Sequence, residues 1–298
     1  MIWAVTFNPS RDMTFYVEGS WHPATICTAR SVYARAGGKG NNVARVIHEL
    51  GYPVTAVGVY GGPTGEVVQK ALESSGIPVL AEIALGDTRT CLTIVDGDGR
   101  VTEIRDPGPS VDSATVERLL DQLLSVVGPG DWVTLSGSLP PGLGVEIWPR
   151  WIGALRARCR GVLVDTSGAN LSAAAEAKPL VLLPNRAEWE EVQLADIRPL
   201  LITDGELGAL WYPPEGPPWR IRSPKVPVKN TVGAGDALLG GLVTGLGQGY
   251  GWDGALRLAV AVAASSVTSP AVADIDRHLI EALLPQVTME LEPSATSR

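Results

Sequence analysis

The sequence predicts an α/β protein in which helices sandwich a mostly parallel β-sheet, with a small antiparallel β lid attached. Short apolar segments alternate with segments of helical length along most of the chain, as in parallel sheets covered on both faces. Between residues 79 and 105, strand-like segments instead follow one another too closely for the crossovers that parallel neighbours need. With 298 residues, 45% of them hydrophobic, the chain is long enough to bury a sizeable core.

The main sheet is expected to contain the short apolar segments, and a helix is expected after most of them. The expected strands cover about residues 1–7, 54–60, 132–136, 162–165, 180–183 and a segment that ends at Thr203. The expected helices cover about residues 64–75, 145–158, 171–177 and 187–194.

The lid is expected from two regions, about residues 11–35 and 79–106, inserted in a single domain that spans residues 1–298. Its expected strands cover about residues 13–17, 26–34, 79–85, 90–95 and 101–105. Asp96-Gly97-Asp98-Gly99 separates the last two and is typical of a hairpin turn. The polar tail, residues 290–298, is expected to fray.

Charge and composition narrow the range of partners. The net charge is −8 and the basic residues form no dense cluster, so no nucleic acid partner is expected. Three widely spaced cysteines and three scattered histidines favour neither a disulfide framework nor a zinc site. The first seven residues are too short for a signal sequence, and no apolar run reaches membrane-spanning length, so a cytoplasmic protein is expected.

The segment Thr231-Val232-Gly233-Ala234-Gly235-Asp236 reads as a glycine turn that opens a helix. Uncovered backbone N–H groups and the positive end of the helix dipole would form a nest for an anion there. An acidic residue at that nest is useful where a neighbouring hydroxyl must lose a proton, so Asp236 is the candidate base for phosphoryl transfer. The alternative is an ordinary helix start with an acidic first turn.

Two further segments bear residues suited to a polar ligand. Gly37–Ala44 is a second glycine-rich turn that enters a helix, with a lysine and two amides at its mouth. Asn8–Asp12 follows the first strand, and a carboxylate at a strand's end can accept hydrogen bonds from sugar hydroxyls. A plain turn remains the alternative for each segment.

Three more turns follow expected strands. Ser136–Gly142 brings glycine and hydroxyl groups to the end of a strand. Asn185 and Glu188 share one helix face and could hold hydrated Mg²⁺, or simply cap the helix. Thr203–Gly208 could contact nucleotide phosphates. All of these turns fall at strand carboxyl ends or helix amino ends, the edge at which open α/β sheets bind ligands.

With these segments, the chain resembles the ribokinase-like (PfkB) carbohydrate kinases over essentially its full length. Gly37–Ala44 and Thr231–Gly241 correspond to the two signatures of that family. Asn8–Asp12, Thr88-Arg89 and Ser136–Gly142 resemble the branch that contains 1-phosphofructokinase, tagatose-6-phosphate kinase and the minor 6-phosphofructokinase.

The resemblance implies ATP-dependent phosphorylation of a hydroxyl on a sugar phosphate: fructose 1-phosphate, tagatose 6-phosphate or fructose 6-phosphate. It implies that Asp236 is the base and that the backbone N–H groups of Gly233, Ala234 and Gly235 form the anion hole. The implied binding residues are Asp12, Gly38 and Asn42 for sugar hydroxyls; Lys39, Arg89 and Ser138 for the sugar's phosphate; Asn185 and Glu188 for Mg²⁺; and Thr203, Gly205 and Gly208 for ATP. A homodimer through the lid is also implied, and a monovalent cation is a further candidate cofactor.

Three departures from the family pattern concern the ATP side. Leu183 stands where the family usually has a lysine before Pro-Asn, and Ser269–Asp274 replaces a glycine-rich segment that flanks adenine. The crossover over residues 192–199 is short, which implies that one face of the sheet is exposed. Two alternatives therefore stay open: a non-catalytic sensor that binds a sugar phosphate, and a kinase of an unphosphorylated sugar or nucleoside. A sensor has no need of Asp236, and Arg89 disfavours a free sugar.

Overall fold

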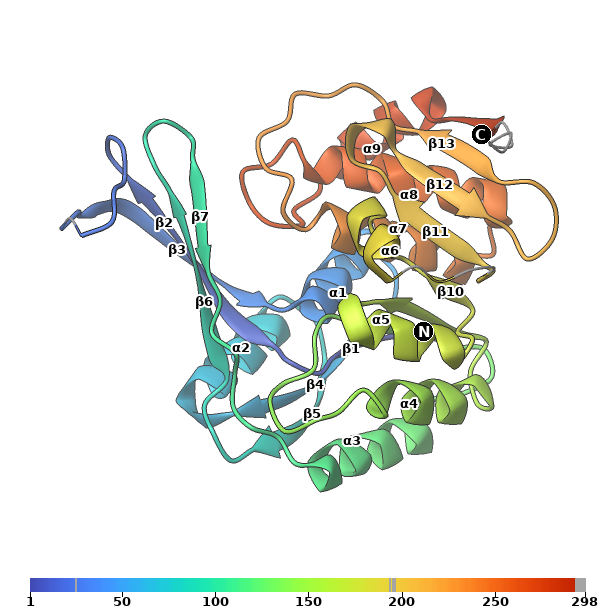
Figure 1. Cartoon of the computed structure of the whole chain (residues 1–298), viewed down its shortest axis with the longest axis horizontal. Helices are drawn as coiled ribbons and strands as arrows, with labels where there is room; N and C mark the ends of the chain where they lie inside the picture. Colours follow the sequence, from blue (N-terminus) through green and yellow to red (C-terminus); the bar gives the residue numbers. More distant parts are fainter. Residues whose placement is uncertain (25, 193, 195–196, 293–298) are drawn as a thin grey trace.

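A ten-stranded sheet forms the body of the molecule, and a separate four-stranded sheet projects from it as a lid (Figure 1). The computed structural model describes residues 1–24, 26–192, 194 and 197–292. In spatial order, the strands of the large sheet are β14 (Thr288–Leu291), β13 (Trp219–Arg222), β12 (Ala209–Tyr212), β11 (Leu200–Thr203), β10 (Val181–Leu182), β9 (Gly161–Asp165), β8 (Trp132–Ser136), β1 (Ile2–Thr6), β4 (Val54–Gly61) and β5 (Val79–Ala84).

The strands from β5 through β11, in this spatial order, run parallel to their neighbours. β12, β13 and β14 continue the sheet with antiparallel pairs. Ile2 of β1 lies beside both Val54 and Trp132, so the carboxyl ends of the central strands reach the same edge. The predicted fold class, a mostly parallel sheet between helices, is confirmed.

Helices cover both faces of the large sheet (Figure 1). They are α1 (Lys39–Glu49), α2 (Gly62–Ser74), α3 (Ser113–Val126), α4 (Ile147–Arg156), α5 (Gly168–Glu176), α6 (Arg186–Val192), α7 (Ala234–Gly247), α8 (Trp252–Ser266) and α9 (Arg277–Leu283), with 3₁₀ turns at Gly205–Leu207 and Leu284–Gln286. Ile2 and Ala4 face the core formed with α1, α2, α7, α8 and α9. Trp3 and Val5 face the core formed with α3, α4 and α5. Because both faces are covered, β1 is apolar almost throughout.

Aromatic packing anchors the segment that leads from β1 into the lid. Phe7 is 1% exposed and meets Trp148 and Trp151 of α4 edge-on, with ring centroids 5.5 and 4.8 Å apart. Burial of one such side chain contributes about 2–3 kcal/mol to stability. This contact fixes the point from which the predicted ligand segment Asn8–Asp12 departs.

The lid sheet contains β3 (Ala29–Gly37), β2 (Ser10–Val17), β6 (Arg89–Val95) and β7 (Val101–Ile104), in that order. β2 pairs antiparallel with β3, and β6 pairs antiparallel with β7 across the predicted hairpin turn, which is confirmed. β2 and β6 are parallel and place Ser10 beside Arg89. The lid therefore brings two segments that are far apart in sequence to one side of the body.

The prediction that residues 79–85 belong to the lid is wrong. β5 pairs parallel with β4 at the edge of the large sheet, with Val79 beside Ala56. α2 supplies the crossover between these two strands. β5 was misplaced because only a short loop separates it from β6, and the chain passes from the body to the lid within that loop.

The expectation that the short 192–199 crossover exposes a sheet face is also wrong. Leu182, Leu200 and Ile202 on this face are only 1–2% exposed. Trp189 of α6 and Tyr212 of β12 pack against the core cluster that contains these three residues. Residues 193 and 195–196 of the crossover lie outside the described residues.

The expected fraying of the tail is wrong for its first residues. Glu290 and Leu291 belong to β14, where they pair with Arg220 and Trp219 of β13. Residues 293–298 lie outside the described part of the chain. Among the described helices, none has the length and apolar character needed to cross a bilayer.

Candidate active site

A cavity of about 500 Å³ lies between the body and the lid, at the carboxyl ends of the parallel strands. The predicted site residues that line it are Asp12, Gly38, Lys39, Asn42, Arg89, Ser138, Asn185, Glu188, Thr203, Gly233, Gly235 and Asp236. Ala234, Gly205 and Gly208 are not among the lining residues. The fold thus gathers into one space residues that are spread over most of the sequence.

The glycine turn before α7 forms an open backbone nest at this cavity. Gly233 has a φ of +83°, and a Cβ there would lie 2.7 Å from the backbone nitrogen of Ala273, so only glycine fits. Within the described residues, the N–H groups of Gly233 and Gly235 make no hydrogen bond, whereas that of Ala234 makes a long turn bond of 3.3 Å to Thr231. Two free donors at the amino end of a 14-residue helix suit an anion.

Asp236 lies in the first turn of α7 and is only 4% exposed. Its Oδ2 accepts a hydrogen bond of 2.7 Å from the side-chain amide of Asn42. Burial is the largest influence and raises the pKa of Asp236 to about 7, against the opposing positive charge of Lys39. A carboxylate whose pKa lies near neutrality is matched to the work of a general base.

Lys39, the first residue of α1, forms an ion pair with Asp165, with Nζ 2.9 Å from Oδ1. Burial alone would lower the pKa of Lys39, but the charges of Asp165 and Asp236 outweigh it and raise that pKa. The charge of Glu188 acts in the same direction. The ammonium therefore stays protonated and lies on the side of the cavity that holds the base.

The turn before α1 packs closely on the end of β1. Gly38 has a φ of +95°, and a Cβ there would lie 2.8 Å from Cγ2 of Thr6. One turn further on, Asn42 is buried and accepts a hydrogen bond of 2.6 Å from Nη2 of Arg45. With its oxygen held by Arg45, the amide must present its NH₂ group to Asp236.

Asp12 enters the cavity from β2 of the lid. Its Oδ1 accepts a hydrogen bond of 2.6 Å from Ser10, and its carboxylate lies against Gly37, where a Cβ would be 2.1 Å from Cγ of Asp12. Burial raises the pKa of Asp12, while the Ser10 bond and the charge of Arg89 oppose that rise. The position suits a carboxylate that accepts bonds from hydroxyls of a ligand.

Arg89, the first residue of β6, is oriented by backbone carbonyl groups. Nη2 donates to the carbonyl of Asn8 at 2.8 Å, and Nη1 donates to that of Asp106 at 3.2 Å. Carbonyl groups hold the guanidinium in place without neutralising its charge, which keeps it available for an anion. Ser138, exposed in the loop after β8, lines the same cavity.

Asn185 and Glu188 form a reciprocal capping box at the start of α6. Glu188 Oε2 accepts from the N–H of Asn185 at 2.9 Å, and Asn185 Oδ1 accepts from the N–H of Glu188 at 2.8 Å. Glu188 Oε1 takes part in neither of these two bonds. Amide and carboxylate oxygens at the cavity surface can accept hydrogen bonds from the water shell of Mg²⁺, so this pair fits the hydrated ion.

The predicted ATP residues divide into two groups. Thr203 lines the cavity, and its backbone pairs with Asn185 in a parallel bridge. Gly205 and Gly208 lie beyond the cavity lining, in the turn that joins β11 to β12. Close packing alone explains why glycine occupies position 208, since a Cβ there would lie 2.0 Å from the carbonyl oxygen of Ile221.

The departures at 183 and 269–274 both lie at the cavity. Leu183 is 4% exposed and lines the cavity beside Asn185 without supplying a charge. Val272 also lines it, and its carbonyl accepts from Nη1 of Arg35, a lid residue, at 3.1 Å. Arg35 also pairs with Asp274 at 3.0 Å, so this segment contacts the lid.

Sequence reasoning missed Asp165 and Arg45. Asp165 ends β9 and pairs with Lys39, and the rule that selected Asp12, a carboxylate at the end of a strand, applies to it as well. Arg45 lies one turn after Asn42 on α1, but its contact with Asn42 depends on side-chain direction and has no signal in the residue pattern.

Comparison with known proteins agrees with this geometry. The model of the pfkB family carbohydrate kinases matches residues 5–277. The 1-phosphofructokinase of Escherichia coli (strain K12) is 32% identical over 304 residues, which cover 96% of this chain and 97% of that protein. The 1-phosphofructokinase of Vibrio cholerae serotype O1 is 31% identical over 301 residues, which cover 95% of this chain and 94% of that protein.

Solved structures give the same result. Phosphofructokinase-2 from Escherichia coli in complex with potassium has a TM-score of 0.88 at 26% identity, covering 96% of this chain and 98% of that one. The structure of that protein with fructose-6-phosphate has a TM-score of 0.86 at 25% identity over the same shares of the two chains. From the family match and these relatives, we conclude that the chain belongs to the pfkB family of carbohydrate kinases.

Proposed function

We propose that this protein transfers the γ-phosphoryl group of ATP to a hydroxyl of a phosphorylated ketohexose, with Asp236 as the general base. Fructose 1-phosphate is the first candidate acceptor, because relatives at 31–32% identity are 1-phosphofructokinases. Fructose 6-phosphate and tagatose 6-phosphate are the others. Both co-substrates are cytoplasmic metabolites, so we also propose a cytoplasmic location.

One observation carries the proposal: a buried carboxylate, Asp236, stands beside an open backbone nest in a cavity that also contains an oriented cation, Arg89. Its raised pKa lets Asp236 take a proton near neutral pH. The nest at Gly233 and Gly235 offers donors to the phosphoryl group in transfer. A protein that only senses a ligand would need neither feature.

In the proposed reaction, Asp236 accepts the proton of the acceptor hydroxyl as that oxygen forms a bond to the γ-phosphorus. The bond between this phosphorus and the oxygen that bridges to the β-phosphate breaks, and ADP leaves with the bonding electron pair. The N–H groups of Gly233 and Gly235 donate to the phosphoryl oxygens as their charge is redistributed.

Arg89 and Lys39 have different charged neighbours, which supports different roles for them. Arg89 is held at the carbonyl groups of Asn8 and Asp106, close to Asp12, and suits the phosphate already on the sugar. Lys39 is influenced by Asp165, Asp236 and Glu188, which supports a role nearer to the phosphoryl group in transfer than the implied role at the sugar's phosphate.

Mg²⁺ is the proposed cofactor, held with its water shell by Asn185 and Glu188. When bound, the ion supplies positive charge to the phosphates of ATP. The capping box keeps the two side chains in place before the ion arrives. A monovalent cation is a second candidate, since a related phosphofructokinase-2 has been solved with potassium.

We also propose a homodimer formed through the lid. Tyr33 of β3 and Val101 and Ile104 of β7, which are the two edge strands of the lid sheet, are 61%, 54% and 52% exposed, an unusual degree of exposure for apolar side chains. A related phosphofructokinase-2 has a tetrameric inhibited form, so relatives of this chain do assemble.

A screen for ADP release tests the function. The purified chain is incubated with MgATP and, in separate reactions, fructose 1-phosphate, fructose 6-phosphate, tagatose 6-phosphate, the free sugars and a nucleoside. We expect turnover with a phosphorylated sugar that exceeds turnover with the free sugars. Better turnover with a free sugar or nucleoside would reassign the acceptor class, and binding of a sugar phosphate without turnover would favour the sensor.

A further inference from the structure

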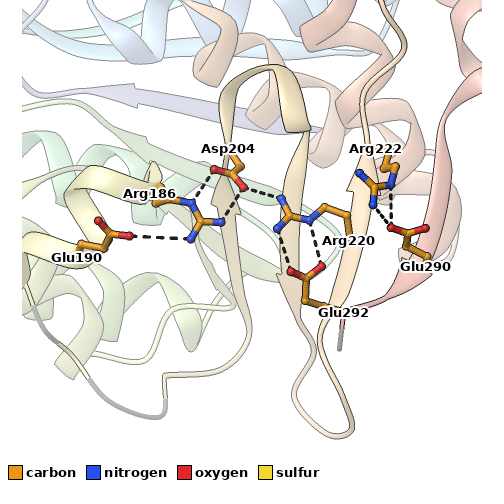
Figure 2. Close-up of polar contacts among 7 residues, drawn as sticks. All are labelled: Arg186, Glu190, Asp204, Arg220, Arg222, Glu290 and Glu292. Atoms are coloured by element: carbon orange, nitrogen blue, oxygen red, sulfur yellow. Dashed lines mark hydrogen bonds and ion pairs between the residues drawn. The ribbon is translucent and has the colours of Figure 1, made fainter. Parts of the chain in front are cut away.

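A cluster of alternating charges lies where α6, β11 and β13 meet (Figure 2). Asp204 follows β11 and accepts two hydrogen bonds of 2.6 Å from Nε and Nη2 of Arg186. It also accepts one of 2.5 Å from Nη1 of Arg220. Arg220 donates in turn to both carboxylate oxygens of Glu292, at 3.1 and 3.0 Å. We call Arg186, Asp204 and Arg220 the Asp204 clamp.

The inner part of the Asp204 clamp is almost fully buried. The side chains of Asp204 and Arg220 are 9% and 10% exposed, whereas that of Arg186 is 44% exposed. Hydrogen bonds from Arg186 and Arg220 hold the pKa of Asp204 at about 2, so the carboxylate stays ionised. A buried ion cluster is costly to break because each charge left behind lacks compensation, so its geometry is strongly fixed.

The clamp joins two loops that both contribute to the cavity. Arg186 directly follows Asn185, and Asp204 directly follows Thr203. Asn185, Glu188 and Thr203 line the cavity, whereas the three clamp residues do not. The backbones of the two loops also meet, since the N–H of Thr203 donates to the carbonyl of Pro184 at 3.0 Å. Two clamp residues are therefore bonded through the chain to residues that line the cavity, although no clamp residue lines it.

α6 is packed on the body mainly through partly buried side chains. None of its seven residues is fully buried, and Trp189 and Val192 are only partly buried against the core. A helix of seven residues is marginal by itself, so its contacts with neighbouring segments matter for its position. The capping box fixes its first turn internally, and the Arg186–Asp204 pair connects that turn to the neighbouring strand.

We propose that Asp204 is a positioning residue for the phosphate donor. Through Arg186 it holds Asn185 and Glu188 in register with Thr203, so that MgATP meets a site that is already arranged. The inference rests on the proposed kinase function. Preorganisation of this kind removes the cost of ordering the loops when the donor binds. The inference predicts that loss of the clamp weakens binding of MgATP and leaves binding of the phosphorylated sugar unchanged.

The test begins with Arg186→Gln, because this side chain is 44% exposed and its replacement is expected to leave the fold intact. The KM for MgATP is expected to rise about tenfold, and the KM for the phosphorylated sugar to stay within about twofold. Arg186→Lys, which keeps the charge but loses the two-pronged contact, is expected to give an intermediate value. The matched control is Arg222→Gln, which removes the exposed pair with Glu290 on the same strands and should change neither KM.

A double-mutant cycle separates positioning from direct contact with ATP. Arg186→Gln and Asp204→Asn both break the Arg186–Asp204 pair, and Asp204→Asn also weakens the bond from Arg220, so the double variant should raise the KM for MgATP no further than Asp204→Asn alone. Additive effects would mean that Arg186 touches the nucleotide itself, and an unchanged KM in Arg186→Gln would mean that the clamp does not position the donor. Either result overturns the inference.

Calorimetric titration of MgATP into the same full-length variants gives a readout that does not depend on turnover. A tenfold higher Kd for MgATP in Arg186→Gln supports the inference, even if no sugar phosphate is turned over. Absence of turnover would refute the proposed function alone. An equal Kd in the parent and in Arg186→Gln overturns the inference, as does a parent that does not bind MgATP. Thermal unfolding of each variant checks that the fold is retained.

Discussion

The side-chain amide of Asn42 donates to Oδ2 of Asp236 at 2.7 Å, and this contact joins the amino ends of α1 and α7. Arg45 holds the amide oxygen of Asn42, so the amide cannot rotate to offer an acceptor instead. Asp236 therefore keeps one oxygen in a fixed bond, and the carboxylate has a defined orientation at the cavity. Two glycine-rich turns that are 190 residues or so apart in sequence thus act on one proton acceptor.

The first prediction concerns Asp236 itself. Asp236→Asn is expected to lower kcat by roughly 10²–10⁴-fold, the usual range for loss of a general base. Substrate binding should persist, because an asparagine oxygen can still accept the bond from Asn42. Steady-state kinetics measure kcat, and titration measures the affinity for the sugar phosphate. An unchanged kcat would show that Asp236 is not the base.

The second prediction is the pH dependence of the rate. The pKa of Asp236 is raised to about 7, and only the ionised form accepts a proton. The value of kcat/KM should therefore fall as the pH drops below about 7 and level off above it. A rate profile between pH 5 and 9 measures this limb.

Ionisation of the sugar phosphate, near pH 6, could produce a similar limb. Asn42→Ala distinguishes the two sources, because the side-chain amide of Asn42 lowers the pKa of Asp236 in the parent protein. Loss of that amide should move the limb to higher pH. A limb at the same pH in both proteins would assign it to the substrate.

Sequence patterns predicted the central sheet well because buried parallel strands leave a clear apolar signal. β1, β4, β8 and β9 are covered on both faces and are almost continuously apolar. β5 was also recognised as a strand, but its partner was not. The residue pattern alone does not say whether this strand joins the large sheet, with β4, or the lid sheet, with β6. β12, β13 and β14 went unassigned because each is only four residues long, and β13 and β14 also carry the charged residues Arg220, Arg222 and Glu290.

The candidate site was predictable where function requires unusual residues at turns. Gly233 and Asp236 stood out because glycine and an acid at a helix start suggest an anion nest and a base. Asp204 carried no such signal, since an acidic residue in a turn is common. Its partners Arg186 and Arg220 come from other elements, and only the folded chain brings the three together.

The third prediction concerns Leu183, which lines the cavity without a charge. Leu183→Lys is expected to lower the KM for ATP by about three- to tenfold, since a partly screened point charge beside a triphosphate is worth ~1 kcal/mol. The melting temperature should fall, because Leu183 is only 4% exposed and packs in the core. Leu183→Met is the control that changes no charge. An equal or higher KM for ATP in the lysine variant would contradict the prediction.

The fourth prediction addresses the class of substrate through Arg89. This guanidinium lines the cavity and is held by the carbonyl groups of Asn8 and Asp106, an arrangement that orients it for an anion. Arg89→Ala should raise the KM for the sugar phosphate roughly ten- to over a hundredfold, since charge-assisted bonds to one phosphate contribute about 1.5–3 kcal/mol. The KM for ATP should change much less. Arg118→Ala, which removes a 56% exposed guanidinium elsewhere, is the control. If the KM for the sugar phosphate is unchanged, Arg89 does not bind that phosphate, and only a broader sugar kinase activity remains supported.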